Sequence, residues 1–375
     1  MMERLRNSIK RFLEILLKRF GIVLLTKTQT EEYLKPYVLT VSPEVRLVLP
    51  SVQNAGDSSR LIFTPTDAVT NQSYVWDYSP MPQKTRQLPF GGIRTGHNVL
   101  CTDFERFHLV QNFLKRGKRI PVKHTILIAP WAHLLDGISF GGYYDFVILV
   151  VAKLCRIREA LPETVWNEAV LSYPLFKTDY EQDYLTLLGF SQDRILDSSH
   201  YDVQFDRCIL ANSGHWFYPD PMDVLALKKQ VEGQLKPQRT EQKRIYVSRS
   251  GRRRVVNENA LITLLKKFNF TIIDDKPRSV AEQVAIYKNA SFILGPHGAS
   301  FTNIIWCEPG THLFELFSAN MVVDHFRYLS QLMGMHYYAY YHGIKMSNSS
   351  IPLEEDVFVS IADLDQCLSR LFVHA

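Results

Sequence analysis

The amino-acid sequence predicts an α/β protein built on a doubly wound parallel sheet, and three observations indicate this class. In the second half of the chain, short β-branched apolar runs alternate with stretches whose apolar residues recur at helical spacing. Such alternation is typical of parallel strands joined by helices. The chain has 375 residues, 46% hydrophobic and 22% charged, which is an ordinary globular composition. At roughly 100–200 residues per domain, this length predicts two domains.

The elements of the second half follow one another regularly. Ser279 and Glu282 precede an apolar stretch and form the signature of a capping box at a helix start, and Asn257 is expected to cap the helix before it. The expected strands are residues 244–249, 270–274, 292–295, 312–317 and 337–341, and the expected helices are residues 257–268, 279–289, 299–306 and 323–333.

The first half is less regular but also indicates an α/β domain. The expected strands are residues 45–49, 61–63, 124–129, 165–172 and 208–211, and the expected helices are residues 143–158 and 179–188. A boundary is expected within residues 218–242, because prolines and a polar run surround one charged helix there. Residues 359–372 have helical spacing, and we expect this last helix to pack back across the first domain.

Charge and cysteine usage exclude several classes of protein. A net charge of +5 is too weak to predict nucleic-acid binding. The five cysteines are scattered without a C-x-x-C pair, so we expect neither a disulfide framework nor a zinc site, and a reducing compartment fits best. The sequence contains no uninterrupted run of about 18 apolar residues, so we expect no transmembrane helix.

The N-terminus has the pattern of a basic amphipathic helix. Its apolar face consists of Leu5, Ile9, Phe12, Leu13, Leu16 and Phe20, and its basic residues are Arg4, Arg6, Lys10, Arg11 and Lys18. Charges within the apolar stretch argue against a signal peptide. Two interpretations remain open: a helix that lies on an anionic membrane surface, or a first helix docked on its own domain.

The segment FILGPHGASF, residues 292–301, places a tight turn between a buried strand and a helix. Helix starts at this position offer backbone N–H groups to phosphate. Gly298 permits close approach, His297 can donate a hydrogen bond, Ser300 adds a hydroxyl and Asn303 follows one turn later. The alternative is a tight turn in which His297 caps the chain and binds nothing.

Charged residues elsewhere in the second half fit the same site. Arg249 ends the first strand of this half and is followed by three arginines at 252–254, a group suited to a diphosphate or else a solvated basic loop. Glu315 lies near the end of a later strand, where an acidic residue can hold ribose hydroxyls or simply face solvent.

The stretches YVSRSGRRRVVNEN and AEQVAIYKNASFILGPHGASFTNIIWCEPGTHLFEL resemble the core of glycosyltransferase family 61, the former DUF563 domain of capsular polysaccharide enzymes. The resemblance implies a GT-B-like fold, with two Rossmann-like domains facing a central cleft. It implies inverting transfer from a nucleotide sugar without a catalytic metal. By resemblance, the donor diphosphate would contact Arg249, Arg254 and His297, its pocket would be lined by Gly298 and Ala299, and Glu315 would hold the ribose.

With this resemblance, the chain divides into five expected parts. These are a basic amphipathic helix (1–27), an acceptor-side α/β domain (28–220), a linker helix (221–243), a nucleotide-sugar-binding domain (244–345) and a C-terminal helix (346–375) that packs on the first domain.

The acceptor side departs from the family. Members usually carry a His in a G-x-Y-x-H-like stretch, where this chain has Asp145. An inverting transfer needs a general base for the acceptor hydroxyl. Asp145 is one candidate, although a carboxylate that faces the helix dipole is an equal interpretation. His133 and Asp136 in the preceding loop are the others.

Other catalytic patterns are weak. The D-x-D at residues 363–365 falls in an expected amphipathic helix, and no His/Cys cluster offers metal ligands. The G-x-S-x-G at residues 137–141 lacks a strand that runs directly into its serine. We therefore expect no metal and no other cofactor.

These features predict a cytoplasmic, peripherally membrane-associated glycosyltransferase. It would use a UDP- or GDP-type nucleotide sugar and a surface-polysaccharide or lipid-linked glycan acceptor. The departure at Asp145 motivates a rival prediction, a catalytically weak relative that binds nucleotide sugar or glycan as a scaffold. A luminal enzyme, suggested by sequons at Asn71 and Asn348, fits the N-terminus and the cysteines less well.

Overall fold

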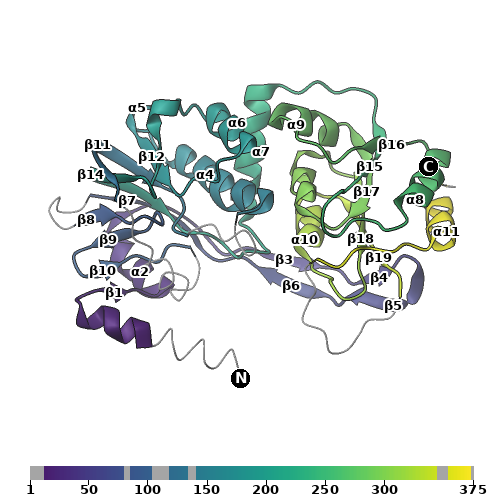
Figure 1. Ribbon diagram of the computed structural model, residues 1–375, viewed down its shortest axis with the longest axis horizontal. Helices are drawn as coiled ribbons and strands as arrows, with labels where there is room; N and C mark the ends of the chain where they lie inside the picture. Colours follow the sequence, from purple (N-terminus) through teal and green to yellow (C-terminus); the bar gives the residue numbers. More distant parts are fainter. Residues whose placement is uncertain (1–11, 80–84, 104–117, 134–140, 344–353, 373–375) are drawn as a thin grey trace. The chain divides into compact units, whose positions relative to one another are not determined.

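The computed structural model describes residues 12–79, 85–103, 118–133, 141–343 and 354–372. The chain divides into two compact units (Figure 1). The first consists of Met1–Val45 and Thr70–Gln234, and the second of Arg46–Val69 and Leu235–Ala375. Arg46–Val69 therefore belongs to the second unit, although these residues fall within the first domain predicted over residues 28–220.

The second unit contains a seven-stranded sheet in the order β16, β15, β17, β18, β19, β4, β5. Its parallel strands include β15 (Lys243–Val247), β16 (Phe270–Ile273), β17 (Ala290–Pro296), β18 (His312–Phe317) and β19 (His336–Tyr341). The connecting helices are α8 (Glu258–Lys267), α9 (Val280–Lys288), the 3-10 helix η5 (Ala299–Trp306) and α10 (His325–Leu332). The parallel α/β sheet predicted for this half is confirmed, and the Ser279–Glu282 capping box forms.

The segment between residues 46 and 69 joins the second unit because it extends this sheet. β4 (Val52–Asn54) pairs with β19, and β5 (Asp57–Phe63) pairs with β4. β3 (Arg46–Leu49) and β6 (Thr66–Val69) form a two-stranded ribbon. Arg327 of α10 is buried and donates hydrogen bonds of 2.8–2.9 Å to three backbone carbonyls of this segment. Long-range backbone pairing, which local patterns do not reveal, decides its place.

The C-terminal helix α11 (Ile361–Phe372) also packs within the second unit, so the prediction that it lies on the first domain is wrong. Its buried Leu364 and Leu368 share a core cluster with Leu261 of α8. The preceding segment is tied down as well, since the Asn257 amide exchanges hydrogen bonds with the Val359 backbone. Asn257 therefore makes no side-chain cap on α8.

The first unit contains a six-stranded sheet in the order β13, β12, β11, β14, β7, β2. Four strands are parallel: β11 (Ile120–Ala129), β12 (Val170–Tyr173), β13 (Ile195–Asp197) and β14 (Tyr201–Ala211). The sheet is extended by β7 (Ser73–Tyr78), which is antiparallel to β14, and by β2 (Val38–Ser42), which is antiparallel to β7. The helices of this sheet are the π-helix η3 (Asp145–Val151), α4 (Ala152–Ala160), α5 (Glu163–Glu168), α6 (Asp179–Leu187) and α7 (Pro221–Leu235).

The strand expected over residues 165–172 is wrong in its first part. Residues 163–168 form α5, which follows Pro162 and buries Trp166, and only Val170–Tyr173 pair in the sheet. The apolar residues of this stretch belong first to a helix and then to a buried strand. Periodicity over so few residues does not distinguish the two.

The N-terminal part of the first unit begins with a helix over residues 12–19. Leu13 and Leu17 pack on a small cluster near a four-stranded sheet. That sheet consists of β1 (Val23–Leu24), β10 (Asn98–Val99), β9 (Ile93–Thr95) and β8 (Thr85–Gln87), and α2 (Lys27–Leu34) follows β1. Phe12, Ile15 and Phe20 are exposed. The rest of the predicted amphipathic helix, residues 1–11, lies outside the described residues.

Candidate functional site

The strand order of the second sheet reverses between β15 and β17. β16 lies on one side of β15, and β17, β18 and β19 follow on the other. In doubly wound sheets, ligands bind at the carboxyl ends of the strands where this reversal occurs. β15 ends at Val247 and β17 at Pro296. Residues 248–254 and 297–298 therefore lie where a ligand of such a sheet is expected.

Two glycines let these loops approach each other closely. A Cβ atom on Gly298 would lie 1.7 Å from Nη1 of Arg249, and a Cβ atom on Gly295 would lie 2.7 Å from the Val247 carbonyl oxygen. In the structure, Nη1 of Arg249 donates a hydrogen bond of 3.0 Å to the His297 carbonyl. The structure therefore brings Arg249, His297 and Gly298 together, as the sequence led us to expect.

The His297 ring is fixed by a buried carboxyl group. Nδ1 of His297 lies 2.5 Å from Oε1 of Glu315, and the Tyr337 hydroxyl donates to Oε2 at 2.6 Å. Burial raises the pKa of Glu315 to about 8, against the opposing effects of Tyr337 and Arg253. Burial, together with the charges of Arg253 and Arg249, lowers the pKa of His297 well below its ordinary value. His297 is therefore neutral near pH 7.

Glu315 does not have the surroundings expected of a ribose ligand. Its side chain is fully buried, and its two oxygens contact His297 and Tyr337. A carboxylate that binds ribose hydroxyls must reach them. The strand position that suggested this role is correct, but the side chain points into the unit.

Arg253, rather than Arg254, acts on the His297–Glu315 pair. The Arg254 side chain is 62% exposed and pairs with Asp356, with 3.1 Å between Nε and Oδ2. Arg253 has a left-handed backbone with φ of 62°, unusual for a residue other than glycine. Its Nε is buried and bonds to no described residue. Burial, followed by Arg249 and Arg252, lowers the pKa of Arg253 to about 10. Such a cluster of positive charge favours an anion.

The remaining predicted donor residues differ in their surroundings. Ala299 begins η5, and Ser300 is exposed beside it. Asn303 is buried, donates to Gln283 at 2.8 Å and accepts from the Trp306 indole at 3.0 Å. Asn303 thus holds η5 against α9, and the structure does not bring it to the loops at the switch point.

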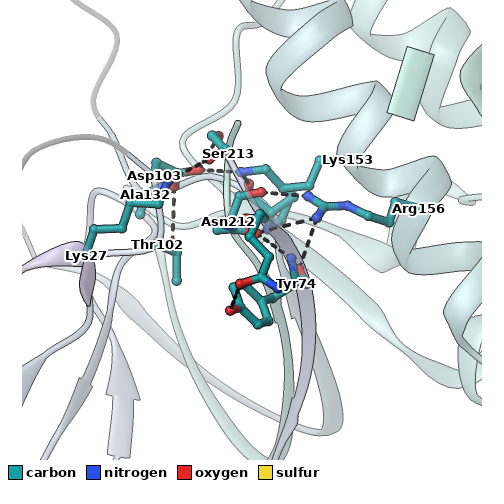
Figure 2. Close-up of polar contacts among 11 residues, drawn as sticks. Lys27, Tyr74, Thr102, Asp103, Ala132, Lys153, Arg156, Asn212 and Ser213 are labelled. Atoms are coloured by element: carbon teal, nitrogen blue, oxygen red, sulfur yellow. Dashed lines mark hydrogen bonds and ion pairs between the residues drawn. The ribbon is translucent and has the colours of Figure 1, made fainter. Parts of the chain in front are cut away.

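In the first unit the strand order reverses between β11 and β14, and a buried polar network lies at the ends of these two strands (Figure 2). Asp103 and Lys153 form a fully buried ion pair. Lys153 also donates to the Pro130 carbonyl at 2.7 Å, and Asp103 accepts from the Ser213 hydroxyl at 2.6 Å and from the Ala132 N–H at 3.0 Å. Burial alone would raise the pKa of Asp103, but Lys153, His133 and Ser213 lower it below its ordinary value.

A second basic residue, Arg156, continues this network toward α7. Arg156 donates to the Asn212 carbonyl at 2.6 Å and pairs with Asp223, with 3.0 Å between Nε and Oδ1. These residues were not among the sites predicted from the sequence. Lys153 and Arg156 stand three positions apart in an otherwise apolar helical stretch, and this pattern could have indicated charges that face inward.

The three candidates for the general base have different surroundings. Oδ2 of Asp145 accepts from the N–H groups of Gly141 and Gly142, and Oδ1 accepts from the Trp216 indole at 2.9 Å. These contacts match the interpretation of Asp145 as a carboxylate at a helix start. His133 is buried and electrostatically coupled to Asp103. Asp136 lies outside the described residues.

The D-x-D at residues 363–365 lies in α11, as expected. Within the described ranges, no three His, Cys, Asp or Glu side chains gather in a way that could hold a metal ion. None of the helices in those ranges is long and apolar enough to cross a bilayer.

The second unit is thus a doubly wound α/β unit that presents arginines and a histidine at its switch point. The chain belongs to glycosyltransferase family 61, whose model matches residues 60–314. A beta-1,2-xylosyltransferase of Arabidopsis thaliana is 36% identical over 61 residues, which make up 16% of this chain and 11% of that protein. A solved structure, the iron-containing heptosyltransferase TibC in complex with ADP-D-beta-D-heptose, aligns over 88% of this chain and 93% of that chain. That alignment has 11% identity and a TM-score of 0.32.

Proposed function

We propose that this protein is an inverting, metal-independent glycosyltransferase of the GT-B class. It transfers a sugar from a UDP- or GDP-linked donor to a surface-polysaccharide or lipid-linked glycan acceptor. The observation that carries the proposal is the meeting of Arg249, Arg253 and His297 at the switch point of the second sheet. Guanidinium groups and a ring N–H suit the diphosphate of such a donor. Membership of family 61 supports the transfer of a sugar.

These groups also suit the chemistry of the transfer. As the acceptor oxygen bonds to the anomeric carbon, the bond from that carbon to the diphosphate oxygen breaks, and negative charge grows on the leaving nucleoside diphosphate. Fixed positive charges stabilise this state more than the ground state. The acceptor proton passes to a general base. The position of the D-x-D supports metal independence. Its two aspartates lie on helix α11 and not on a loop at the switch point, where they could hold a metal beside the donor.

The first test is calorimetric binding of UDP, GDP and their common sugar conjugates, with and without EDTA. We expect one nucleotide to bind with an affinity that EDTA does not change. Arg253→Ala is expected to weaken this binding about tenfold or more, since a hydrogen bond to a charged group contributes about 1.5–3 kcal/mol. Arg254→Ala is the matched control and should change the affinity by less than about twofold, because Arg254 already pairs with Asp356.

Turnover, measured beside binding, separates the proposed glycosyltransferase from the scaffold that the sequence offers as its rival. Binding of a nucleotide sugar without its turnover, across a panel of acceptors, would favour a scaffold that has lost activity. Equal losses in Arg253→Ala and Arg254→Ala would contradict the placement of the donor. Binding of none of the nucleotides would contradict the proposed donor site itself.

We further infer that His133 takes the acceptor proton, with Asp103 stabilising the ring when it is charged. The support is the electrostatic coupling between these two residues and the engagement of both Asp145 oxygens. His133→Gln should lower kcat about 100-fold with unchanged donor affinity. Asp145→Asn should mainly lower the melting temperature. Single-turnover transfer and thermal unfolding check these results, and the reverse pattern would return the base role to Asp145.

We also propose that the enzyme is cytoplasmic and associates with an anionic membrane surface through its N-terminal helix. Exposed Phe12, Ile15 and Phe20 lie beside exposed Lys18 and Arg19, a combination suited to acidic lipid. The cytoplasmic part of the proposal is supported by the five cysteines, which all lie in the described residues and are buried free thiols, as suits a reducing compartment. Deleting residues 1–20 should abolish co-sedimentation with vesicles that contain phosphatidylglycerol. Neutral phosphatidylcholine vesicles are the control, and retention of the truncated protein would refute the assignment.

A further inference from the structure

We propose that Glu315 is a positioning residue that holds the His297 ring so that Nε2 faces the donor's diphosphate. This inference rests on the proposed function of the second unit as the donor site. It gives Glu315 a role that acts through His297 and not through the ribose.

The geometry fixes which ring nitrogen is available. Nδ1 of His297 is engaged by Oε1 of Glu315 at 2.5 Å, while the structure gives Nε2 no hydrogen bond to any described residue. The ring plane is held by stacking on Phe317, with 5.4 Å between ring centroids and 22° between planes, and by the tilted ring of Phe326 at 5.3 Å. A half-turn of the ring in this plane would put a carbon in place of Nδ1 and break the contact with Glu315.

The carboxyl group is itself held from the opposite side. Tyr337 of β19 donates to Oε2 at 2.6 Å, and β18 and β19 are paired in register from His312 to Phe317. Tyr337 on β19 thus orients Glu315 on β18, and Glu315 orients His297 at the end of β17. All three strands belong to one sheet. In the proposal, the His297 ring contacts the donor, while Glu315 and Tyr337 only orient that ring. Residues around a metal site orient the metal's ligands in the same way.

The proton positions follow first from the burial of this pair and then from the charges that face it, of which Arg253 alone favours a charged Glu315. Arg253 and Arg249 from the loop after β15 disfavour a charged His297, and Asp324 before α10 disfavours a charged Glu315. Burial raises the pKa of Glu315 to about 8 and lowers that of His297, so both are neutral near pH 7. The Glu315 carboxyl then donates to Nδ1, and the ring carries its own hydrogen on Nε2. A hydrogen on Nε2 is what a phosphate oxygen requires.

The test uses inorganic pyrophosphate beside UDP and GDP, because pyrophosphate has no ribose. Glu315→Leu should weaken pyrophosphate binding about tenfold or more, since the ring loses its orientation. Glu315→Gln should rescue binding to within about threefold of wild type, because its amide can donate to Nδ1 and accept from Tyr337. Tyr337→Phe should give a smaller loss than Glu315→Leu.

Two further measurements separate positioning from a merely structural role. On a His297→Ala background, Glu315→Leu should cause no additional loss of pyrophosphate affinity, because the two residues act as one unit. Wild-type affinity should fall as pH rises past about 8, where ionised Glu315 accepts from Nδ1 and leaves Nε2 without hydrogen. The Glu315→Gln variant should show no such fall. Circular dichroism and thermal unfolding of each variant exclude misfolding.

The possible results decide the question. Unchanged pyrophosphate affinity in Glu315→Leu, with weakened UDP or GDP binding, would overturn the proposal and restore the ribose role. Additive losses in the double variant would overturn it as well. If wild type binds neither pyrophosphate nor a nucleotide, the proposed donor function fails first. If wild type binds and His297→Ala does not, while Glu315→Leu behaves as wild type, only the positioning role fails.

Discussion

Replacing His297 by alanine is expected to lower kcat about 100- to 1000-fold, the range found when one preorganised donor to a developing negative charge is removed. His297 follows directly on β17, its backbone carbonyl accepts from Arg249, and the orientation of its ring is fixed by Glu315. Because it is neutral near pH 7, it would stabilise the leaving diphosphate through a hydrogen bond rather than a full charge. Transfer rates measured in single turnover report this loss separately from product release.

A matched control lies on the same sheet. His312 begins β18, so it lies at the opposite ends of the strands from His297, and its ring stacks on Phe292 and Tyr338. His312→Ala removes a ring of the same size from the same unit and should leave kcat within about twofold of wild type. Equal losses in the two variants would show that His297 acts through the stability of the sheet and not on the donor. Thermal unfolding of both variants measures that contribution directly.

The second large effect is expected on stability, from the ion pair of the first unit. Lys153→Met should lower the free energy of unfolding of this unit by about 3–5 kcal/mol, the cost of leaving a buried charge without its partner. Both members of the pair are fully buried, and Asp103 would keep only neutral donors such as the Ser213 hydroxyl. Urea unfolding followed by tryptophan fluorescence reports mainly on this unit, which contains Trp76, Trp131, Trp166 and Trp216.

Two comparisons define the origin of this loss. Lys229→Met removes a lysine whose pair with Glu159 is exposed, and it should cost less than about 1 kcal/mol. Combining Lys153→Met with Asp103→Leu removes both charges and should recover most of the lost stability. The pKa of Asp103 is lowered in the folded unit, so its contribution is present above the ordinary carboxyl pKa. That contribution should disappear as pH falls through the lowered value.

Local signals were sufficient to predict much of the second unit. Apolar periodicity located its strands and helices, and the pairing of Ser279 with Glu282 marked the start of α9. Gly298 predicted a close approach of other groups to the backbone, and the structure places Arg249 there. These features depend on neighbours within a few positions, so one sequence suffices to find them.

The amino-acid sequence was therefore sufficient to predict the α/β class, the succession of strands along the second half and the position of His297. Long-range contacts in the tertiary structure determine which arginine acts on His297, because Arg254 pairs with Asp356, 102 positions away, and Arg253 takes a left-handed backbone. The tertiary structure likewise turns Glu315 inward and pairs Asp103 with Lys153, 50 positions apart. Side-chain direction and long-range partners are settled by burial and by the need to satisfy buried charge, and no local pattern encodes them.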